Sequence, residues 1–95
     1  MTFCVYLLLQ INIKNKISYV GYTNNITNRL KLHNNSKGAK FTKGKKWKLI
    51  YKKKYSTKSE AMKEEFKLKK NRKMREYIKN HYNEKKNENI NLITL

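Results

Sequence analysis

The chain of 95 residues lacks proline and aspartate altogether and contains a single cysteine, Cys4. A lone cysteine cannot form a disulfide within the chain, which favours a reducing, intracellular setting. The longest apolar run covers only residues 4–9, whereas a membrane-spanning helix needs about 20 apolar residues. No positively charged segment precedes that run, as a signal peptide would require. We therefore expect an intracellular protein with no membrane partner.

The scarcity of acidic residues limits the metal chemistry that the chain can support. All six acids are glutamates, at positions 60, 64, 65, 76, 84 and 88. A site that holds two metal ions usually needs several converging carboxylates, and this chain can hardly supply them. Any metal must therefore rest on one or two carboxylates, with water and phosphate oxygens completing its coordination.

Positive charge, in contrast, is abundant. Lysine and arginine together number 24, of which 21 are lysine, and the formal net charge is +18. Such a field favours a polyanionic partner; nucleic acid is the usual one, and an anionic membrane surface is the main physical alternative. The 21 lysines and 13 asparagines could instead reflect an AT-rich coding sequence.

Three segments have the composition of β-strands. Residues 2–13 are apolar and rich in β-branched side chains, which is typical of a strand buried on both faces. Residues 17–22 follow after a short polar break, so the two segments are expected to pair as an antiparallel hairpin. Residues 47–55 alternate between apolar or aromatic and lysine side chains, with Ile50 breaking the alternation, and predict a third strand.

Helical spacing appears in three other segments. Residues 23–34 place Ile26 and Leu30 on one side of a helix, with Thr23 or Asn24 as its N-cap.

The capping-box pattern Thr57-Lys58-Ser59-Glu60 opens a second helix that is expected to end near Lys70. A third helix is predicted over 72–82, and residues 34–46 are expected to form a polar loop. The chain is thus predicted to be an α+β domain over residues 1–82. Residues 83–95 form a tail that either frays or docks on the core through Ile90, Leu92, Ile93 and Leu95.

Glu65 is the most informative acidic residue. It falls in the middle of an apolar stripe on the second predicted helix, where an uncompensated carboxylate would be costly. We therefore expect Glu65 to bind a metal or another cation, and an ordinary ion pair with Lys69 or Arg29 is the structural alternative. The stripe comprises Ala61, Met62, Phe66 and Leu68.

Two further pairs of side chains could take part in phosphate chemistry. Arg29 and His33 are four residues apart and share a helical face; the arginine suits phosphate, and the histidine can titrate near neutrality. The alternative is a solvated arginine and a histidine hydrogen-bonded in the core. Tyr6 and Tyr19 lie on adjacent predicted strands and can approach each other, although tyrosine is common in strands in any case.

A glycine in a strand and a basic loop complete the candidates. Gly21 weakens a strand, so it marks a place where another group approaches the backbone closely. The loop around Lys40 could contact phosphate, or it could be a mobile solvated loop. The residues expected to contact nucleic acid are Gly21, Lys40, Lys43, Lys45, Lys46 and Lys69.

Together these residues resemble the motifs of the GIY-YIG nuclease superfamily. The closer likeness is to its small stand-alone branch, the short single-domain proteins of bacteria and some large DNA viruses. The first strand of that branch typically reads YVYLL, and here it reads CVYLLL. The stretches SYVGYTNNITNRLKLHN, KGAKFTKGKKWKLIY and STKSEAMKEEFKLKK resemble the three remaining blocks in order, so the likeness covers about residues 3–70.

The resemblance implies a three-stranded antiparallel sheet flanked by helices, with residues 1–82 as the GIY-YIG-like domain. It implies hydrolysis of a DNA phosphodiester with one divalent ion, Mg²⁺ or Mn²⁺, on branched, nicked or single-stranded DNA, in repair or recombination. A protein partner could supply the specificity. The implied roles are Tyr6 as the GIY tyrosine, Tyr19 as the YIG tyrosine, Gly21 as the motif glycine, Arg29 as the helix arginine, His33 as the next polar residue and Glu65 as the metal ligand.

These roles suggest a division of labour. Arg29 could hold a nonbridging oxygen, and Tyr6, with a lowered pKa or a basic neighbour, could take a proton from water. His33 or Tyr19 could orient that water or Tyr6. The charge of +18 is expected to lower the pKa of a nearby tyrosine. Tyr22 is expected to serve packing.

The chain departs from the superfamily motifs at several positions. Cys4 stands where the motif has glycine, and Val5 and Val20 replace isoleucines. Asn71 is a candidate for the late asparagine of the family, without a firm match. A basic DNA-binding module without cutting activity is the main alternative, and a nuclease directed at RNA is another.

Overall fold

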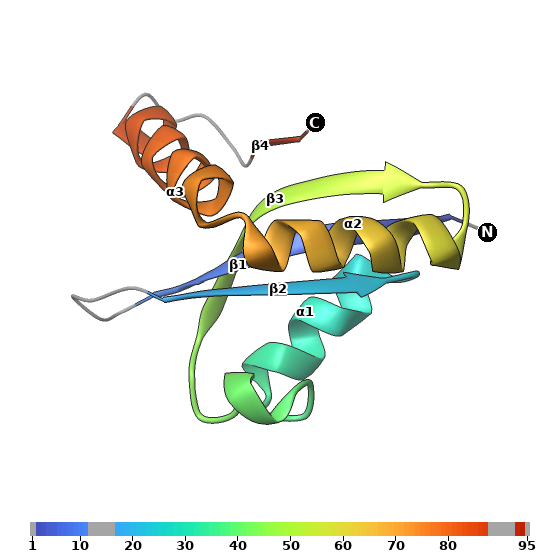
Figure 1. The fold of residues 1–95 in the computed structure, drawn as a ribbon. Helices are drawn as coiled ribbons and strands as arrows, with labels where there is room; N and C mark the ends of the chain where they lie inside the picture. The colour runs from blue at the N-terminus through green and yellow to red at the C-terminus, as the bar shows by residue number, and fades with distance from the viewer. Residues whose placement is uncertain (1, 12–16, 88–92, 95) are drawn as a thin grey trace.

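The computed structural model describes residues 2–11, 17–87 and 93–94, with side chains as far as residue 82. Its sheet has the strand order β2-β1-β3-β4, so that β1 is central and β2 lies at an edge (Figure 1). The predicted α+β class and the three antiparallel strands are confirmed. These strands are β1 (Phe3–Gln10), β2 (Ser18–Thr23) and β3 (Trp47–Tyr55).

The observed strand boundaries agree most closely with the predicted ones where apolar and lysine side chains alternate in the sequence. β3 covers the predicted residues 47–55, whereas β1 ends at Gln10, earlier than expected for 2–13. Ile50, which breaks the alternation of β3, lies at an irregularity in its pairing with β1, between the partners of Leu7 and Leu8. The bulge turns both Ile50 and Tyr51 toward the same core.

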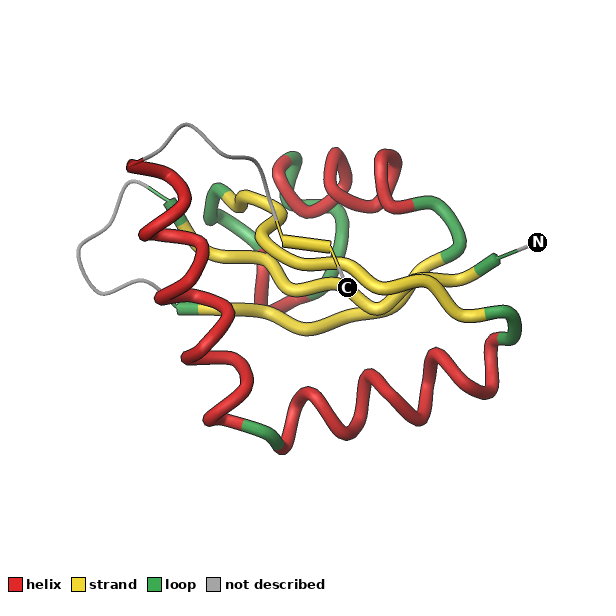
Figure 2. The backbone as a smooth tube through the Cα atoms, turned by 90° about the horizontal axis from the view of Figure 1, so that it is seen from above, coloured by secondary structure: helices red, strands yellow, loops and turns green. Residues whose placement is uncertain are grey.

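Helices cover both faces of the sheet. Figure 2 shows α2 (Lys58–Lys70) and α3 (Arg72–Asn87) on one side and α1 (Ile26–Asn34) on the other. Successive side chains of β1 point to opposite faces. Val5, Leu7 and Leu9 therefore join the core under α2 and α3, while Tyr6 and Leu8 join a smaller cluster with α1 and Trp47.

The helix starts depend on single side chains. Thr57 accepts a hydrogen bond from Glu60 N at 3.1 Å, which confirms the predicted cap of α2. The predicted cap of α1 is wrong: the N-cap is Asn25, whose side chain accepts from Asn28 N at 3.1 Å. Thr23 is still part of β2, and its hydroxyl accepts from Asn25 N instead.

The apolar stripe predicted for α2 is wrong in part. Ala61 and Leu68 are buried, but Met62 and Phe66 are 48% and 57% exposed. The buried side of the helix is therefore turned away from Met62 and Phe66. Glu65 consequently lies at the margin of the buried stripe, where its carboxylate can face a cavity rather than the core.

The C-terminal segment contributes one short strand. Residues Ile93–Thr94 form β4, which pairs in parallel with β3 at Tyr51 and Lys52. The expected docking of Ile90, Leu92 and Leu95 falls on residues outside the described part of the chain. None of the described helices is long and apolar enough to cross a membrane.

Candidate active site

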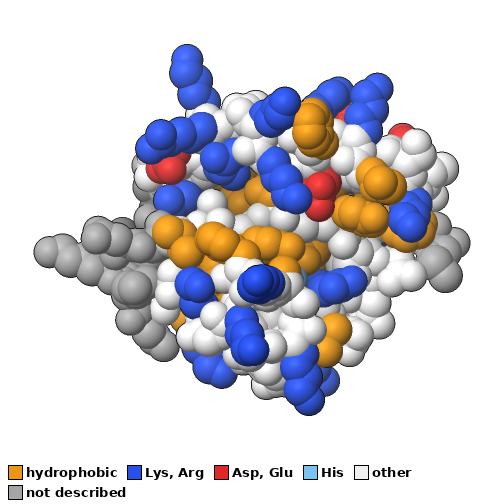
Figure 3. Space-filling view, turned by 60° about the horizontal axis from the view of Figure 1, so that its bottom comes forward, with side chains coloured by type: hydrophobic (Ala, Val, Ile, Leu, Met, Phe, Trp, Pro, Cys, Tyr) orange, Lys and Arg blue, Asp and Glu red, His pale blue; other side chains and the backbone are white. Residues whose placement is uncertain are grey.

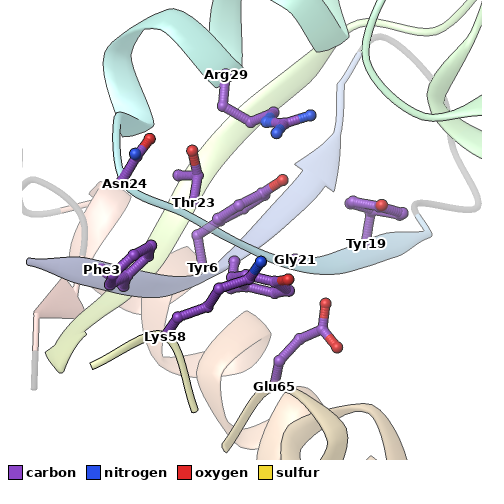
Figure 4. A pocket seen from close by; sticks show the side chains of 10 residues that line it. Phe3, Tyr6, Tyr19, Gly21, Thr23, Asn24, Arg29, Lys58 and Glu65 are labelled. Atoms are coloured by element: carbon purple, nitrogen blue, oxygen red, sulfur yellow. The ribbon is translucent and has the colours of Figure 1, made fainter. Parts of the chain in front are cut away.

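A pocket opens at the β2 edge of the sheet, where the layers on its two faces meet. It has a volume of about 530 Å³. Figure 4 shows Arg29 entering from α1, Glu65 and Lys58 from α2, and Tyr6 and Tyr19 from the strands between them. The lining residues are Phe3, Tyr6, Tyr19, Gly21, Tyr22, Thr23, Asn24, Arg29, Lys58 and Glu65. The structure therefore brings together, in one cavity, five of the predicted site residues: Tyr6, Tyr19, Gly21, Arg29 and Glu65.

The group that approaches Gly21 closely is the side chain of Tyr6. Gly21 pairs with Tyr6 across the strands, and the tyrosine ring lies over the glycine. A Cβ atom built on Gly21 would lie 2.5 Å from Cζ of Tyr6, far inside van der Waals contact. The close approach that the glycine permits is thus made by the ring of Tyr6.

His33 lies behind Tyr6 rather than in the cavity. It is 1% exposed, and its Nε2 atom is 2.8 Å from the Tyr6 hydroxyl. On the other side of the ring, Nδ1 is 2.8 Å from the Thr42 hydroxyl. The ring also lies close over Gly38, where an added Cβ would be 2.8 Å from Cε1 of His33.

Thr42 determines the tautomer of His33. The threonine hydroxyl oxygen is 2.8 Å from the carbonyl oxygen of Ala39, and two oxygens at that distance would repel unless the hydroxyl donates its single proton to the carbonyl. The hydroxyl must then accept from Nδ1–H of His33. Nε2 is consequently free of hydrogen and accepts the proton of the Tyr6 hydroxyl.

Burial shifts the pKa values of both rings away from the charged forms. It raises the pKa of Tyr6 above its ordinary value, with Tyr19 adding to the shift and Arg29 opposing it. The expectation that the net charge would lower the pKa of this tyrosine is therefore wrong, because desolvation outweighs the positive field. Burial, and to a lesser extent Arg29, lowers the pKa of His33, so its neutral form is favoured. Of the two routes expected for Tyr6, the basic neighbour is the one found here.

The two basic residues of the pocket come from opposite helices. Arg29 is half-buried on α1, and Lys58 is exposed at the first residue of α2. Such a pair can approach an anion from two directions and neutralise charge on it. Figure 3 shows further lysine and arginine side chains on both sides of an apolar band that crosses this face.

Glu65 supplies the acidic group of the pocket. Its side chain is 17% exposed, and Oε1 lies 3.4 Å from Nζ of Lys69. The ion pair considered as a structural alternative thus exists, but Lys69 is 50% exposed and can move into solvent. A single carboxylate oxygen donor facing a polar cavity fits Mg²⁺ or Mn²⁺, which accept few protein ligands beside water and phosphate. Within residues 2–11, 17–87 and 93–94 no cluster of three metal-ligating side chains occurs.

The remaining predicted contacts lie outside this pocket. Lys40, Lys43 and Lys46 are exposed around the short 3₁₀ turn at Lys40–Thr42. Asn71 accepts from Met74 N at 3.0 Å and thereby caps α3, so it has a structural task away from the cavity. Tyr22 lines the cavity but also packs against the core under α2.

Three residues of the site were missed by sequence reasoning: Gly38, Thr42 and Lys58. Gly38 and Thr42 affect the site through their contacts with His33, and no local sequence pattern predicts these contacts. Lys58 belongs to the capping box, and its place could have been inferred from helical spacing. Lys58 and Glu65 are seven residues apart, which is about two helical turns, so they lie on the same side of α2.

The buried histidine predicts a dependence of stability on pH. Because its folded pKa is below its unfolded value, the unfolded chain binds a proton first as the pH falls. The free energy of unfolding should therefore decrease as the pH falls below about 6.5, the ordinary pKa of histidine. Above that pH, His33 should not affect the free energy of unfolding. Urea titrations of the wild type and of His33→Gln test this, since the variant should lose the slope. The matched variant His81→Gln, on α3, should keep it; equal slopes in all three proteins would contradict the prediction.

The chain matches one protein family over most of its length. The family is described as the GIY-YIG catalytic domain, and the match covers residues 2–89.

Curated bacterial relatives carry only family-type names. "UPF0213 protein YazA" of Bacillus subtilis is 44% identical over 78 residues, which are 79% of this chain and 79% of the relative. "UPF0213 protein SAG0778" of Streptococcus agalactiae is 44% identical over 69 residues, 70% of this chain and 78% of the relative. "UPF0213 protein OB0043" of Oceanobacillus iheyensis is 50% identical over 52 residues, 54% of this chain and 60% of the relative. The chain thus spans less than two thirds of the length of the Oceanobacillus relative. No solved structure matches the chain.

Proposed function

We propose that this chain, which belongs to the GIY-YIG family, is an endonuclease that hydrolyses DNA phosphodiester bonds with a single divalent ion, Mg²⁺ or Mn²⁺. The observation that carries the proposal is the convergence of Arg29, Glu65 and Tyr6 on one cavity in a strongly basic protein, with His33 hydrogen-bonded to Tyr6 from behind. DNA hydrolysis needs an activated water and neutralisation of charge on the phosphate. Each of these needs has a named side chain in the cavity.

Water activation falls to Tyr6 and His33. A water in the cavity can donate to the Tyr6 oxygen, whose own proton already points to Nε2 of His33. As the water oxygen attacks phosphorus, its proton passes to Tyr6 while the Tyr6 proton passes to His33. The bond from phosphorus to the leaving ester oxygen of the DNA breaks, and that oxygen takes a proton from solvent water. The phenolate that burial disfavours is never formed, and the product is an imidazolium held through Nδ1–H by Thr42.

The basic side chains serve the phosphate. Arg29 can hold a nonbridging oxygen with its planar guanidinium, and Lys58 can approach the same group from α2. Glu65 would hold the divalent ion, which when bound supplies electrostatic stabilisation of the phosphate charge. Tyr19 contacts the rings of both Tyr6 and His33, with centroids 6.5 and 5.1 Å away, and so holds the pair in place.

A cleavage screen tests the proposal. The full chain is incubated with duplex, single-stranded, flap and junction DNA in Mg²⁺, in Mn²⁺ and in EDTA. Products that form with a divalent ion and disappear in EDTA support the nuclease. Tight, salt-dependent binding without a product from any substrate would instead favour a DNA-binding module without cutting activity.

Thr42→Val should impair the proton transfer between Tyr6 and His33 without leaving a cavity at position 42. The variant keeps the shape but leaves Nδ1–H of His33 without its acceptor, so the free energy of unfolding should fall by about 1–3 kcal/mol. The cleavage rate should fall by about 10²-fold, because the tautomer that accepts from Tyr6 is no longer favoured. Thr42→Ser keeps the hydroxyl and should retain most of the rate. Full activity of Thr42→Val, measured where circular dichroism shows it folded, would remove Thr42 from the relay.

A further inference from the structure

A second, smaller cavity lies next to the candidate active site. It has a volume of about 290 Å³ and is lined by Ser18, Tyr19, Val20, Phe41, Lys69 and Arg75. Tyr19 lines both cavities, so the two are neighbours along β2. Lys69, which pairs with Glu65 of the first cavity, also reaches this one. A polymer bound with one residue in the first cavity would therefore place its adjacent residue near the second cavity.

The exposed ring of Phe41 is the distinctive feature of this cavity. Phe41 is 51% exposed although it is a large apolar side chain. Its ring stacks on Tyr19, with centroids 6.0 Å apart and planes 20° apart, and leans on the buried Trp47 at 6.3 Å. Trp47 is itself held by a hydrogen bond from Nε1 to the Thr42 carbonyl. Phe41 is thus a supported aromatic surface rather than a loose side chain.

Cations surround this aromatic surface. Nζ of Lys45 lies 5.3 Å from the centre of the Phe41 ring and donates to the Phe41 carbonyl. Arg75 is fixed at the far side, because its Nη1 donates to the Leu68 carbonyl at 2.9 Å and also to the Lys69 carbonyl. Aromatic rings with basic side chains around them are the usual way in which proteins bind unpaired nucleotides: the ring stacks on the base and the cations meet the phosphate.

We propose that the cavity at Phe41 binds one unpaired nucleobase of a DNA strand whose adjacent phosphate lies in the first cavity. The inference rests on the proposed function in taking DNA as the ligand, and it adds that the strand is unpaired at that nucleotide. A base in a duplex is stacked and paired, so it cannot enter a cavity of this size without being released. Lys45 would leave the ring for the phosphate as the base enters, since its ammonium is held by one exposed hydrogen bond to the Phe41 carbonyl and by the ring face.

The small size and the basic rim favour a base over a protein partner. Protein interfaces need broad patches, with about 800 Å² buried on each side. The apolar side chains at this cavity are Phe41, its support Tyr19 and the buried Val20. The other lining residues, Ser18, Lys69 and Arg75, are polar or basic.

Binding measurements without a divalent ion test the inference separately from cleavage. The probe is a fluorescein-labelled single-stranded oligonucleotide, compared with a blunt duplex of the same sequence, in EDTA. Phe41→Ala should weaken binding of the single strand by about 5- to 150-fold, the loss expected for one stacked base, and change duplex binding little. Phe41→Trp should bind as well as the wild type or better. Phe66→Ala is the matched control, because Phe66 is equally exposed and has Lys70 over its ring at 4.5 Å, but lies on α2 outside this cavity.

An abasic scan identifies the nucleotide. Removing the base at one position of the strand should weaken binding to the wild type and have no further effect on Phe41→Ala. Equal losses of single-strand and duplex affinity in Phe41→Ala, or an equal effect of Phe66→Ala, would overturn the inference. If the base dependence is found but no DNA is ever cut, the inference stands and the proposed nuclease activity fails; cleavage without base dependence gives the reverse result.

Discussion

Glu65→Gln is expected to lower the rate of DNA cleavage by about 10³-fold or more, because the substitution removes the charged ligand proposed for the divalent ion, whose contribution is several kcal/mol. DNA affinity should stay the same or rise slightly, since a negative charge is removed from a basic surface. Cleavage is measured by single turnover with saturating protein, and affinity by anisotropy in EDTA. The variant keeps the size of the side chain, so a loss of folding is not expected.

Glu64→Gln is the matched control for this experiment. It makes the same change of charge one residue away, at a carboxylate that pairs with Lys67 at 3.5 Å and lines a different cavity. Glu64→Gln should cut at the wild-type rate. If Glu65→Gln also cuts normally, or if both variants lose activity equally, Glu65 is not the metal ligand.

Tyr6→Phe should lower the cleavage rate by about 10²- to 10⁴-fold, the range of general acid–base catalysis. The substitution keeps the ring over Gly21 and removes only the hydroxyl that joins the cavity to His33. DNA binding in EDTA should be unchanged, because the phosphate contacts of Arg29 and Lys58 remain.

Tyr51→Phe provides the control for removal of a buried tyrosine hydroxyl. Tyr51 is 6% exposed and belongs to the core under α2 and α3, away from the candidate active site. The Tyr51→Phe variant should therefore cut DNA at the wild-type rate. An active Tyr6→Phe would show that water is activated by another group, and the relay through His33 would have to be abandoned.

Much of the fold could be predicted because the decisive interactions are local. The capping box of α2 consists of hydrogen bonds between Thr57 and Glu60, which are three residues apart. The alternating side chains of residues 47–55 predict β3 without knowledge of its neighbours. Helical periodicity predicted too wide a buried stripe on α2, because Met62 and Phe66 are apolar yet face solvent. A helical pattern shows which residues share a side, but not which side meets the core.

The site itself was predictable as a set of residues and not as a set of contacts. The resemblance selected Tyr6, Arg29 and Glu65, which the structure brings to one cavity. The partner of Tyr6 depends on a contact across 27 residues to His33, and the tautomer depends on Thr42 beyond it. Net charge was a poor guide to the pKa of Tyr6, because charge acts over the whole surface while desolvation acts at the buried hydroxyl.

The glycines beneath the two rings have a consequence for natural variation. Every replacement of Gly21 or Gly38 adds a Cβ, and that atom would collide with Tyr6 or His33 respectively. Gly44 differs: it has a φ of 76° and no atom within 4 Å of an added Cβ, so asparagine, which tolerates that conformation, could replace it. In a saturation library selected for function, positions 21 and 38 should therefore remain glycine, while position 44 should accept other residues. Two residues without side chains would thus be as intolerant of mutation as the groups proposed to be catalytic.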